Sequence, residues 1–218
     1  MIRRQDPAWM WVAVAFGGAL ALAVAVLAAN GTGPEGIGLA VRVTARWSFL
    51  FFWLSYTGGS MAVLFGPAFA GLARVARPSG LAFAAALQAH IGLVVWLGVV
   101  TGRVPLQGAL LWFFLIALFF AYLLALLSFG IGRHGLGRLW RPVLVLATTY
   151  ILIAFGRDFV LGALAGTAWS WVYTAEYVLF AFMSIIAIPL RVAALRRRPG
   201  TLRPAPPTAE SDREAVEC

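Results

Sequence analysis

The sequence predicts an all-α integral membrane protein, a bundle of six transmembrane helices. Of its 218 residues, 62% are hydrophobic and 11% are charged, and the mean hydropathy is +0.89. This composition is typical of a polytopic membrane protein and excludes an ordinary soluble domain. The net charge of +9 does not indicate a nucleic-acid partner, because most arginines fall next to the apolar runs, where anionic lipid headgroups lie.

The predicted helices follow the apolar runs in order. These runs cover residues 9–29, 43–65, 80–101, 106–129, 143–160 and 169–190. The first run exceeds the roughly 7–15 apolar residues of a secretory signal, so we assign it as the first transmembrane helix. The fourth run holds about twenty consecutive uncharged residues, which is too long for a strand.

The regions outside the runs complete the predicted organisation. Residues 1–8 form a short cytoplasmic N-terminus, and residues 9–190 form one transmembrane domain. Residues 191–218 are rich in proline and acidic side chains and poor in large apolar groups, so we expect a disordered cytoplasmic tail.

The placement of arginine predicts the orientation of the bundle. The chain has 17 basic residues, all of them arginine. With the N-terminus inside, four arginines face outward: Arg42, Arg46, Arg103 and Arg157. The other thirteen lie on the cytoplasmic side, which is the positive-inside pattern of membrane proteins. Both termini are therefore expected in the cytoplasm.

The segment GIGRHG, residues 130–135, matches the G-x-G-x-x-G pattern of dinucleotide-binding loops. Such a loop needs a buried strand before it, so that its glycines bring the backbone and a helix N-terminus to the pyrophosphate. A predicted transmembrane helix precedes this segment instead. We therefore interpret it as a cytoplasmic turn between the fourth and fifth helices.

His90 is the only ionisable side chain placed close to the membrane midplane. It lies about ten residues from either end of the third predicted helix, or about 15 Å at ~1.5 Å per residue. A polar group at that depth is costly unless it is paired or functional. Two interpretations stay open: a histidine hydrogen-bonded to Gln88, Thr148 or Thr149, and an axial haem ligand. The other histidine, His134, falls in a predicted loop and lies too far away to share one iron.

Other charged side chains are predicted near the outer membrane surface. Aromatic residues surround Glu176: Trp169, Trp171, Tyr173 and Tyr177. They resemble an interfacial belt, which would place the carboxylate among the outer headgroups. Arg157 and Asp158 lie at the end of the fifth predicted helix, on the same outer side as Glu176. We interpret Arg157 as an arginine whose side chain extends to the headgroups, and Asp158 as a solvated acid beside it.

Three segments carry a resemblance to a known family. The segment SGLAFAAALQAHIGLVVWL, residues 79–97, places His90 where that family has a haem ligand in its third helix. Residues 29–57 are similar to its first outer loop, and LLALLSFGIGRHGLGRLW, residues 123–140, is similar to the exit of its fourth helix. Over residues 9–160 the chain resembles the ferric-reductase-like transmembrane domain, most closely the bacterial haem-binding membrane subunit of the methionine-sulfoxide reductase system.

The resemblance implies a haem b site whose other ligand positions have changed. Leu144 and Arg157 stand where the family carries histidines on its fifth helix, and Arg103 stands at a further ligand position of the full ferric-reductase pattern. Leucine cannot ligate iron and arginine stays protonated, so His90 is the one remaining candidate ligand.

Three functions remain open at this point. The leading expectation is a haem-free partner or scaffold subunit, which Leu144 and Arg157 favour. The alternative is a b-type haem electron-transfer subunit, an oxidoreductase component with altered axial ligation through His90. The third is an anion- or ligand-binding site at the outer face, formed by Arg103 and Arg157, which the resemblance places opposite each other.

The expected surroundings follow from composition and resemblance. The lipid bilayer is the first partner, and a redox or periplasmic protein is the second. The expected location is the plasma (inner) membrane of a bacterium. We assign no catalytic residue, because no nucleophile accompanies His90 in the manner of a hydrolytic triad, and no internal repeat indicates a transporter.

Overall fold

The chain is a multi-pass helical membrane protein, as the sequence predicts. The computed structural model describes residues 8–103, 106–128, 137–164 and 171–197. Within these ranges six helices are long and apolar enough to cross a membrane: α1 (Ala8–Asn30), α2 (Pro34–Phe65), α3 (Ala70–Thr101), α4 (Gly108–Leu126), α6 (Trp140–Leu164) and α7 (Trp171–Arg197). Short 3-10 helices, Pro67–Phe69 and Gly137–Leu139, precede α3 and α6.

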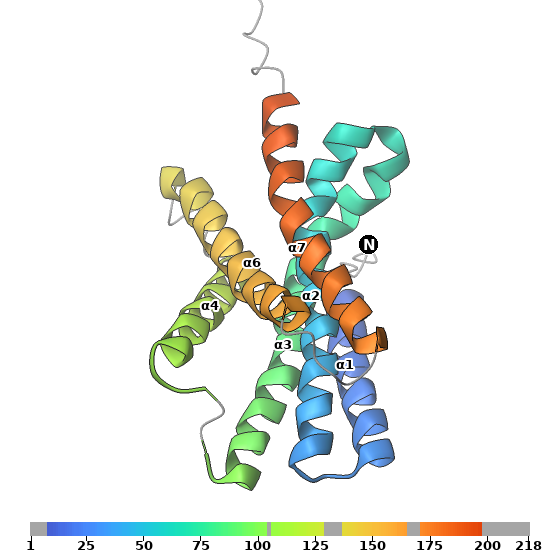
Figure 1. The fold of residues 1–218 in the computed structure, drawn as a ribbon. Coiled ribbons are helices and arrows are strands. Elements are labelled where there is room, and N and C mark those ends of the chain that lie inside the picture. The colour runs from blue at the N-terminus through green and yellow to red at the C-terminus, as the bar shows by residue number, and fades with distance from the viewer. Residues whose placement is uncertain (1–7, 104–105, 129–136, 165–170, 198–218) are drawn as a thin grey trace, which may run out of the picture.

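Successive helices run in opposite directions (Figure 1). We call the end where α1 begins and α7 ends the terminal side, and the end where α1 meets α2 and α3 meets α4 the loop side. α2 packs most extensively on α3 and also contacts α1 and α7, whereas α4 packs on α6 and has little contact with α3. The bundle thus consists of a tight α1–α2–α3 group and an α4–α6 pair, with α7 in contact with both α2 and α6.

The core of the bundle is aromatic. Phe49 of α2 is fully buried, and the rings of Phe52, Phe155, Phe159 and Phe180 lie 5.0–6.2 Å from its centroid. Aromatic pairs at such separations add about 0.5–1.5 kcal/mol each beyond the effect of burial. This cluster joins α2 to α6 and α7.

Small residues allow the close approach of α1, α2 and α3. A Cβ on Gly58 of α2 would lie 2.7 Å from the Leu72 carbonyl oxygen of α3, so no larger residue fits there without a shift of the backbone. Ala15 and Ala19 of α1 are fully buried, and the Trp47 indole N–H donates to the Ala15 carbonyl at 2.9 Å. Small interface residues and interhelical hydrogen bonds are how helices associate in lipid.

Three helix boundaries differ from the prediction by seven residues or more. α2 begins at Pro34, nine residues before the expected 43, and α3 begins at Ala70, ten residues before the expected 80. α7 continues to Arg197, whereas the tail was expected to begin at residue 191. Hydropathy sets the ends of an apolar run, but a helix continues through polar residues. Pro34 at the first helical position and Glu35 in the first turn are helix-start signals in their own right.

Some predicted features lie outside the described residues. These are the glycine-rich turn of residues 130–135 with His134, and the tail from residue 198. The cytoplasmic position of the two termini stays a prediction, because the helices alone do not fix which side faces the cytoplasm.

Replacing the central aromatic residue should weaken the bundle. We expect Phe49→Ala to lower the free energy of unfolding by about 3 kcal/mol, because four ring contacts are lost and a cavity is left. The check is thermal unfolding in detergent followed by circular dichroism. Phe119→Ala is the matched control, since Phe119 is 61% exposed on the lipid-facing surface; equal losses in the two variants would contradict the assigned core.

The orientation can be tested with the only cysteine of the chain, Cys218. If the terminal side is cytoplasmic, a membrane-impermeant maleimide should label Cys218 only after the cells are permeabilised. A cysteine introduced at Gly33, between α1 and α2, in a Cys218→Ser background should be labelled in intact cells. The reverse pattern would show that the bundle is inserted the other way round.

Candidate functional site

A cavity of about 740 Å³ lies between α2, α3, α4 and α6. Small-molecule pockets in proteins have volumes of about 300–1,000 Å³. Apolar side chains make most of its wall, including Phe83, Leu87, Leu118, Ile151, Phe155 and Phe159. Its ionisable side chains are Arg42, His90, Arg103 and Asp158. The cavity is therefore an apolar chamber with a small set of polar groups.

The cavity opens toward the lipid-facing surface. Val95 and Val99 of α3 line it and are 61% and 75% exposed, and Leu115 of α4 lines it and is 41% exposed. These residues lie on the two helices that have little contact with each other. A lipophilic molecule could therefore enter sideways from the bilayer, between α3 and α4.

His90 is held by the backbone of α2. Its Nδ1 lies 3.1 Å from the Val41 carbonyl oxygen and 3.4 Å from the Thr44 hydroxyl oxygen. A carbonyl only accepts, so Nδ1 carries the proton of the neutral ring, and Nε2 keeps its lone pair. The Thr44 hydroxyl proton is donated to the Ala40 carbonyl at 2.8 Å. His90 is hydrogen-bonded, as the first interpretation expected, but its partners lie on α2.

Two of the three partners expected for His90, Gln88 and Thr148, are engaged elsewhere. The Gln88 amide donates to the Tyr122 hydroxyl at 2.6 Å. The Thr148 hydroxyl donates to the Leu144 carbonyl at 2.7 Å and accepts from Arg191 at 3.0 Å. The backbone of α2 therefore supplies the acceptor that the sequence analysis sought among polar side chains.

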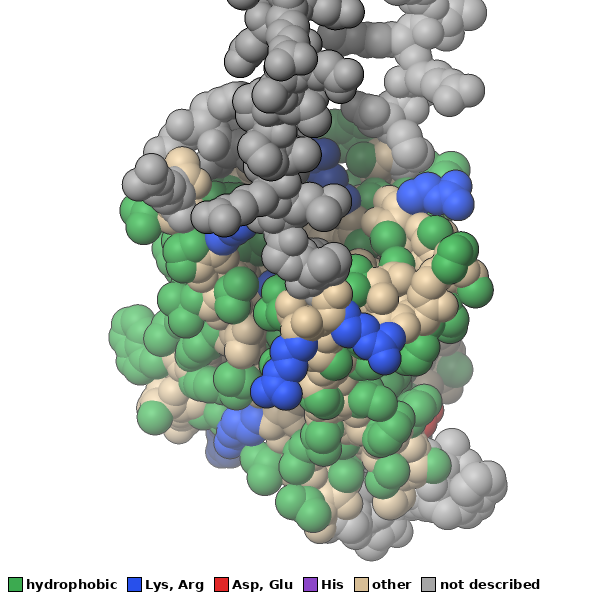
Figure 2. All heavy atoms as spheres, turned by 90° about the horizontal axis from the view of Figure 1, so that it is seen from above, with side chains coloured by type: hydrophobic (Ala, Val, Ile, Leu, Met, Phe, Trp, Pro, Cys, Tyr) green, Lys and Arg blue, Asp and Glu red, His purple; other side chains and the backbone are tan. Residues whose placement is uncertain are grey.

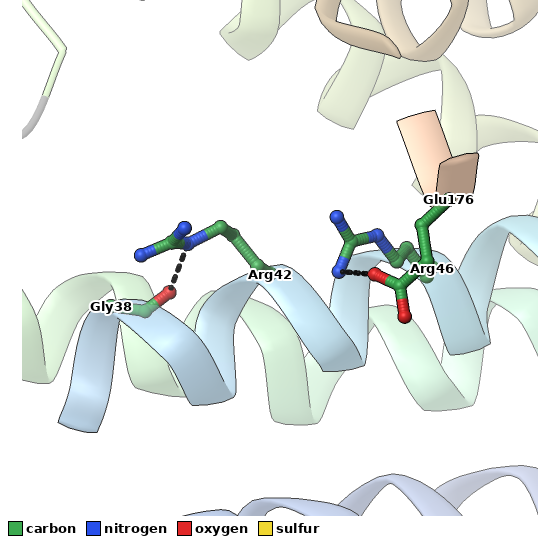
Figure 3. A network of polar contacts seen from close by, with 4 residues as sticks. All are labelled: Gly38, Arg42, Arg46 and Glu176. Atoms are coloured by element: carbon green, nitrogen blue, oxygen red, sulfur yellow. Dashed lines mark hydrogen bonds and ion pairs between the residues drawn. The ribbon is translucent and has the colours of Figure 1, made fainter. Parts of the chain in front are cut away.

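An ion pair between a buried arginine and a half-exposed glutamate connects α2 to α7 next to the cavity (Figure 3). Arg46 Nη1 lies 2.9 Å from Glu176 Oε2, and the Arg46 guanidinium stacks over the Tyr177 ring at 4.8 Å. Arg46 is 8% exposed, and its Nη2 has no hydrogen-bond partner among the residues that the structure describes. The expectation that Glu176 lies among the outer headgroups stays a prediction, and the structure adds that its half-exposed carboxylate pairs with Arg46.

Arg42 lies one helical turn before Arg46 and leaves α2 on the same side (Figure 3). Its Nε donates to the Gly38 carbonyl at 3.3 Å. Both arginines were expected on the outer side, Arg42 just before the predicted second helix and Arg46 near its start, but α2 begins at Pro34 and includes both. Since His90 contacts residues 41 and 44, the two arginines lie at nearly its depth. The prediction that His90 is the only deep ionisable group is therefore wrong.

Of the two arginines that were predicted to converge, only Arg103 lines the cavity. Arg103 follows the end of α3 and lines the cavity together with His90. Arg157 is not among the cavity-lining residues; its guanidinium lies 6.0 Å from the centroid of the Phe113 ring of α4. Its neighbour Asp158 does line the cavity and interacts electrostatically with Arg157 and Arg46.

Arg42, Arg46 and Asp158 are site residues that the sequence analysis missed. A signal for the first two was present, because Gly33, Pro34 and Glu35 indicate a helix start before the apolar run. No comparable signal pairs Arg46 with Glu176, which lies on another helix far along the chain.

The cavity could hold a porphyrin through one axial bond only. Nε2 of His90 is a suitable iron ligand, and Arg42 and Arg103 could pair with carboxylates. Among the described residues that line the cavity, no other is a histidine, cysteine or methionine. Across the described ranges, no group of three or more His, Cys, Asp or Glu residues could hold a metal ion.

No protein-family model, curated protein or solved structure matches this chain. The resemblance to the ferric-reductase-like domain therefore stays a prediction. What stands is a multi-pass membrane protein with an apolar cavity in its bundle.

The ion pair provides a direct test of this arrangement. We expect Glu176→Gln to lower the free energy of unfolding by about 2 kcal/mol, because the buried Arg46 loses its directly paired carboxylate and keeps only the electrostatic interaction with Asp158. This is below the ~3–5 kcal/mol of a fully buried pair, since the Glu176 side chain keeps 43% exposure. The measurement is thermal unfolding in detergent, with Glu35→Gln at the start of α2 as control. A double variant, Arg46→Met with Glu176→Gln, should recover part of the loss; strict additivity would argue against a coupled pair.

Proposed function

We propose that the protein is a haem-free membrane subunit that binds a lipophilic ligand in the cavity between α2, α3, α4 and α6. The observation that supports this most is the cavity of about 740 Å³, with apolar walls and a neutral imidazole. A subunit that served only as a scaffold would gain stability by filling this space, because protein interiors are close-packed and a void forfeits dispersion contacts. A bound molecule accounts for the volume.

The polar groups of the wall indicate the chemistry of the ligand. Nε2 of His90 accepts a hydrogen bond, so it favours a ligand with a hydroxyl group. Arg42 and Arg103 donate hydrogen bonds, so they favour a carbonyl or acidic oxygen on the same molecule. A long apolar molecule with an oxygenated ring, such as an isoprenoid quinol, combines these features.

A b-type haem electron-transfer subunit is the second candidate. The observation in its favour is the bond from Nδ1 of His90 to a backbone carbonyl, because metal-ligating histidines are oriented by such bonds. A bound haem would supply one-electron transfer, with His90 as its axial ligand. This candidate ranks second because Leu144 and Arg157, at the other implied ligand positions, are not among the cavity-lining residues. For either candidate function, we propose a redox or periplasmic partner protein and a location in a bacterial plasma membrane.

The experiment is to identify what co-purifies with the protein. Purified protein is extracted with organic solvent for mass spectrometry, and its absorption spectrum is recorded before and after reduction. We expect an oxygenated lipophile and no haem Soret band. In His90→Ala the retained ligand should fall about fivefold, the effect of one lost hydrogen bond of ~1 kcal/mol.

Two controls make the outcome decisive. His90→Gln keeps an acceptor and should retain more ligand than His90→Ala. Leu179→Ala, at an exposed position of α7 outside the cavity wall, should behave as wild type. A Soret band that disappears in His90→Ala would establish the haem candidate instead. Protein that carries neither ligand nor haem, and is not stabilised by added quinol, would leave only the scaffold function.

A further inference from the structure

A second cavity lies on a different face of α3, toward the terminal side. Its volume is about 630 Å³, and it is bounded by the start of α1, the first half of α3 and the end of α4. The residues that matter for its chemistry are Trp9, Arg74, Arg77, Ala85, Gln88 and Tyr122. None of them lines the first cavity.

The rim of this second cavity is positively charged. Arg74 and Arg77 lie three residues apart on α3, so their side chains share one face of the helix, and both are exposed. No acidic residue occurs among the described residues that line it. Two neighbouring guanidinium groups suit a phosphate, which accepts paired N–H donors.

The dimensions of the cavity match one leaflet of a bilayer. Trp9 begins α1 beside the arginines and is 67% exposed, as expected of a tryptophan at the membrane surface. The hydrogen bond between Gln88 and Tyr122 crosses from α3 to α4 at the deeper end. From Arg77 to Gln88 is eleven residues, or ~16 Å at 1.5 Å per residue, about half of the ~30 Å hydrocarbon core. Alanines and leucines line the groove between these ends.

We propose that this groove binds one anionic phospholipid. The phosphate sits between Arg74 and Arg77, and an acyl chain runs along α3 toward the Gln88–Tyr122 pair. On this side of the bundle arginine side chains are spread among apolar ones (Figure 2), so the surface as a whole suits an anionic leaflet. The lipid also fills space between α4 and the α1–α3 pair, because α4 has little direct contact with either of these two helices.

The test measures lipid retention by native mass spectrometry. Wild-type protein in detergent micelles is offered phosphatidylglycerol and phosphatidylcholine with identical acyl chains. We expect retention of phosphatidylglycerol to exceed that of phosphatidylcholine on the order of tenfold, and the double variant R74Q/R77Q to lose this preference. R141Q is the matched control, since Arg141 is exposed at the start of α6 and does not line the groove.

A second variant tests the acyl-chain part of the site. Ala85→Phe narrows the groove without removing charge, so it should reduce retention of both lipids, and it keeps the test valid if R74Q/R77Q does not fold. Equal preference for phosphatidylglycerol in wild type and R74Q/R77Q would overturn the proposal. So would full displacement of the lipid by millimolar inorganic phosphate, which would show an anion site without a chain site. Ligand retention in the first cavity should not change in these variants.

Discussion

A charged side chain inside a bilayer needs a partner, and the ion pair of Arg46 with Glu176 meets this requirement by fixing α7 against α2. α7 contacts both α2 and α6, and α6 in turn packs against α4. The position of the α4–α6 pair relative to the α1–α2–α3 group therefore depends on the placement of α7 as well as on the direct ring contacts of Phe49 with Phe155 and Phe159. The first cavity lies between these two groups, so the ion pair contributes to its shape.

Two further contacts hold α7 at other depths. The Trp53 indole N–H donates to the Met183 carbonyl at 2.8 Å, near the middle of the helix. Toward the terminal side, Arg191 donates to the Thr148 hydroxyl at 3.0 Å and stacks over the Tyr56 ring at 4.5 Å. Polar contacts of this kind associate helices where lipid offers no hydrophobic driving force. These contacts fix α7 at three levels. By contrast, α4 packs mainly on a single neighbour, α6.

The sequence was sufficient for the number and order of the helices, because the length and hydropathy of an apolar run are local properties. It was also sufficient for the place of His90 in the third helix. It was not sufficient for the partners of His90, because its acceptor is the Val41 carbonyl, and backbone groups of a neighbouring helix leave no mark in a sequence pattern. The pairing of Arg46 with Glu176 joins residues 130 positions apart and depends on the packing of α7. Only the early start of α2 could have been inferred locally, from Pro34 and its neighbours.

Both cavities border α3 and α4, the two consecutive helices with little contact between them. Together they leave about 740 and 630 Å³ on two faces of α3 where side chains of α4 would otherwise pack. An occupant of either cavity would supply contacts that the protein itself does not make, so binding and the stability of α4 are linked. By mass action, a ligand that binds only the folded bundle stabilises it in proportion to the logarithm of its free concentration over its dissociation constant. The sparse packing of α4 that admits a molecule from the bilayer is thus also the reason that the molecule, once bound, completes the bundle.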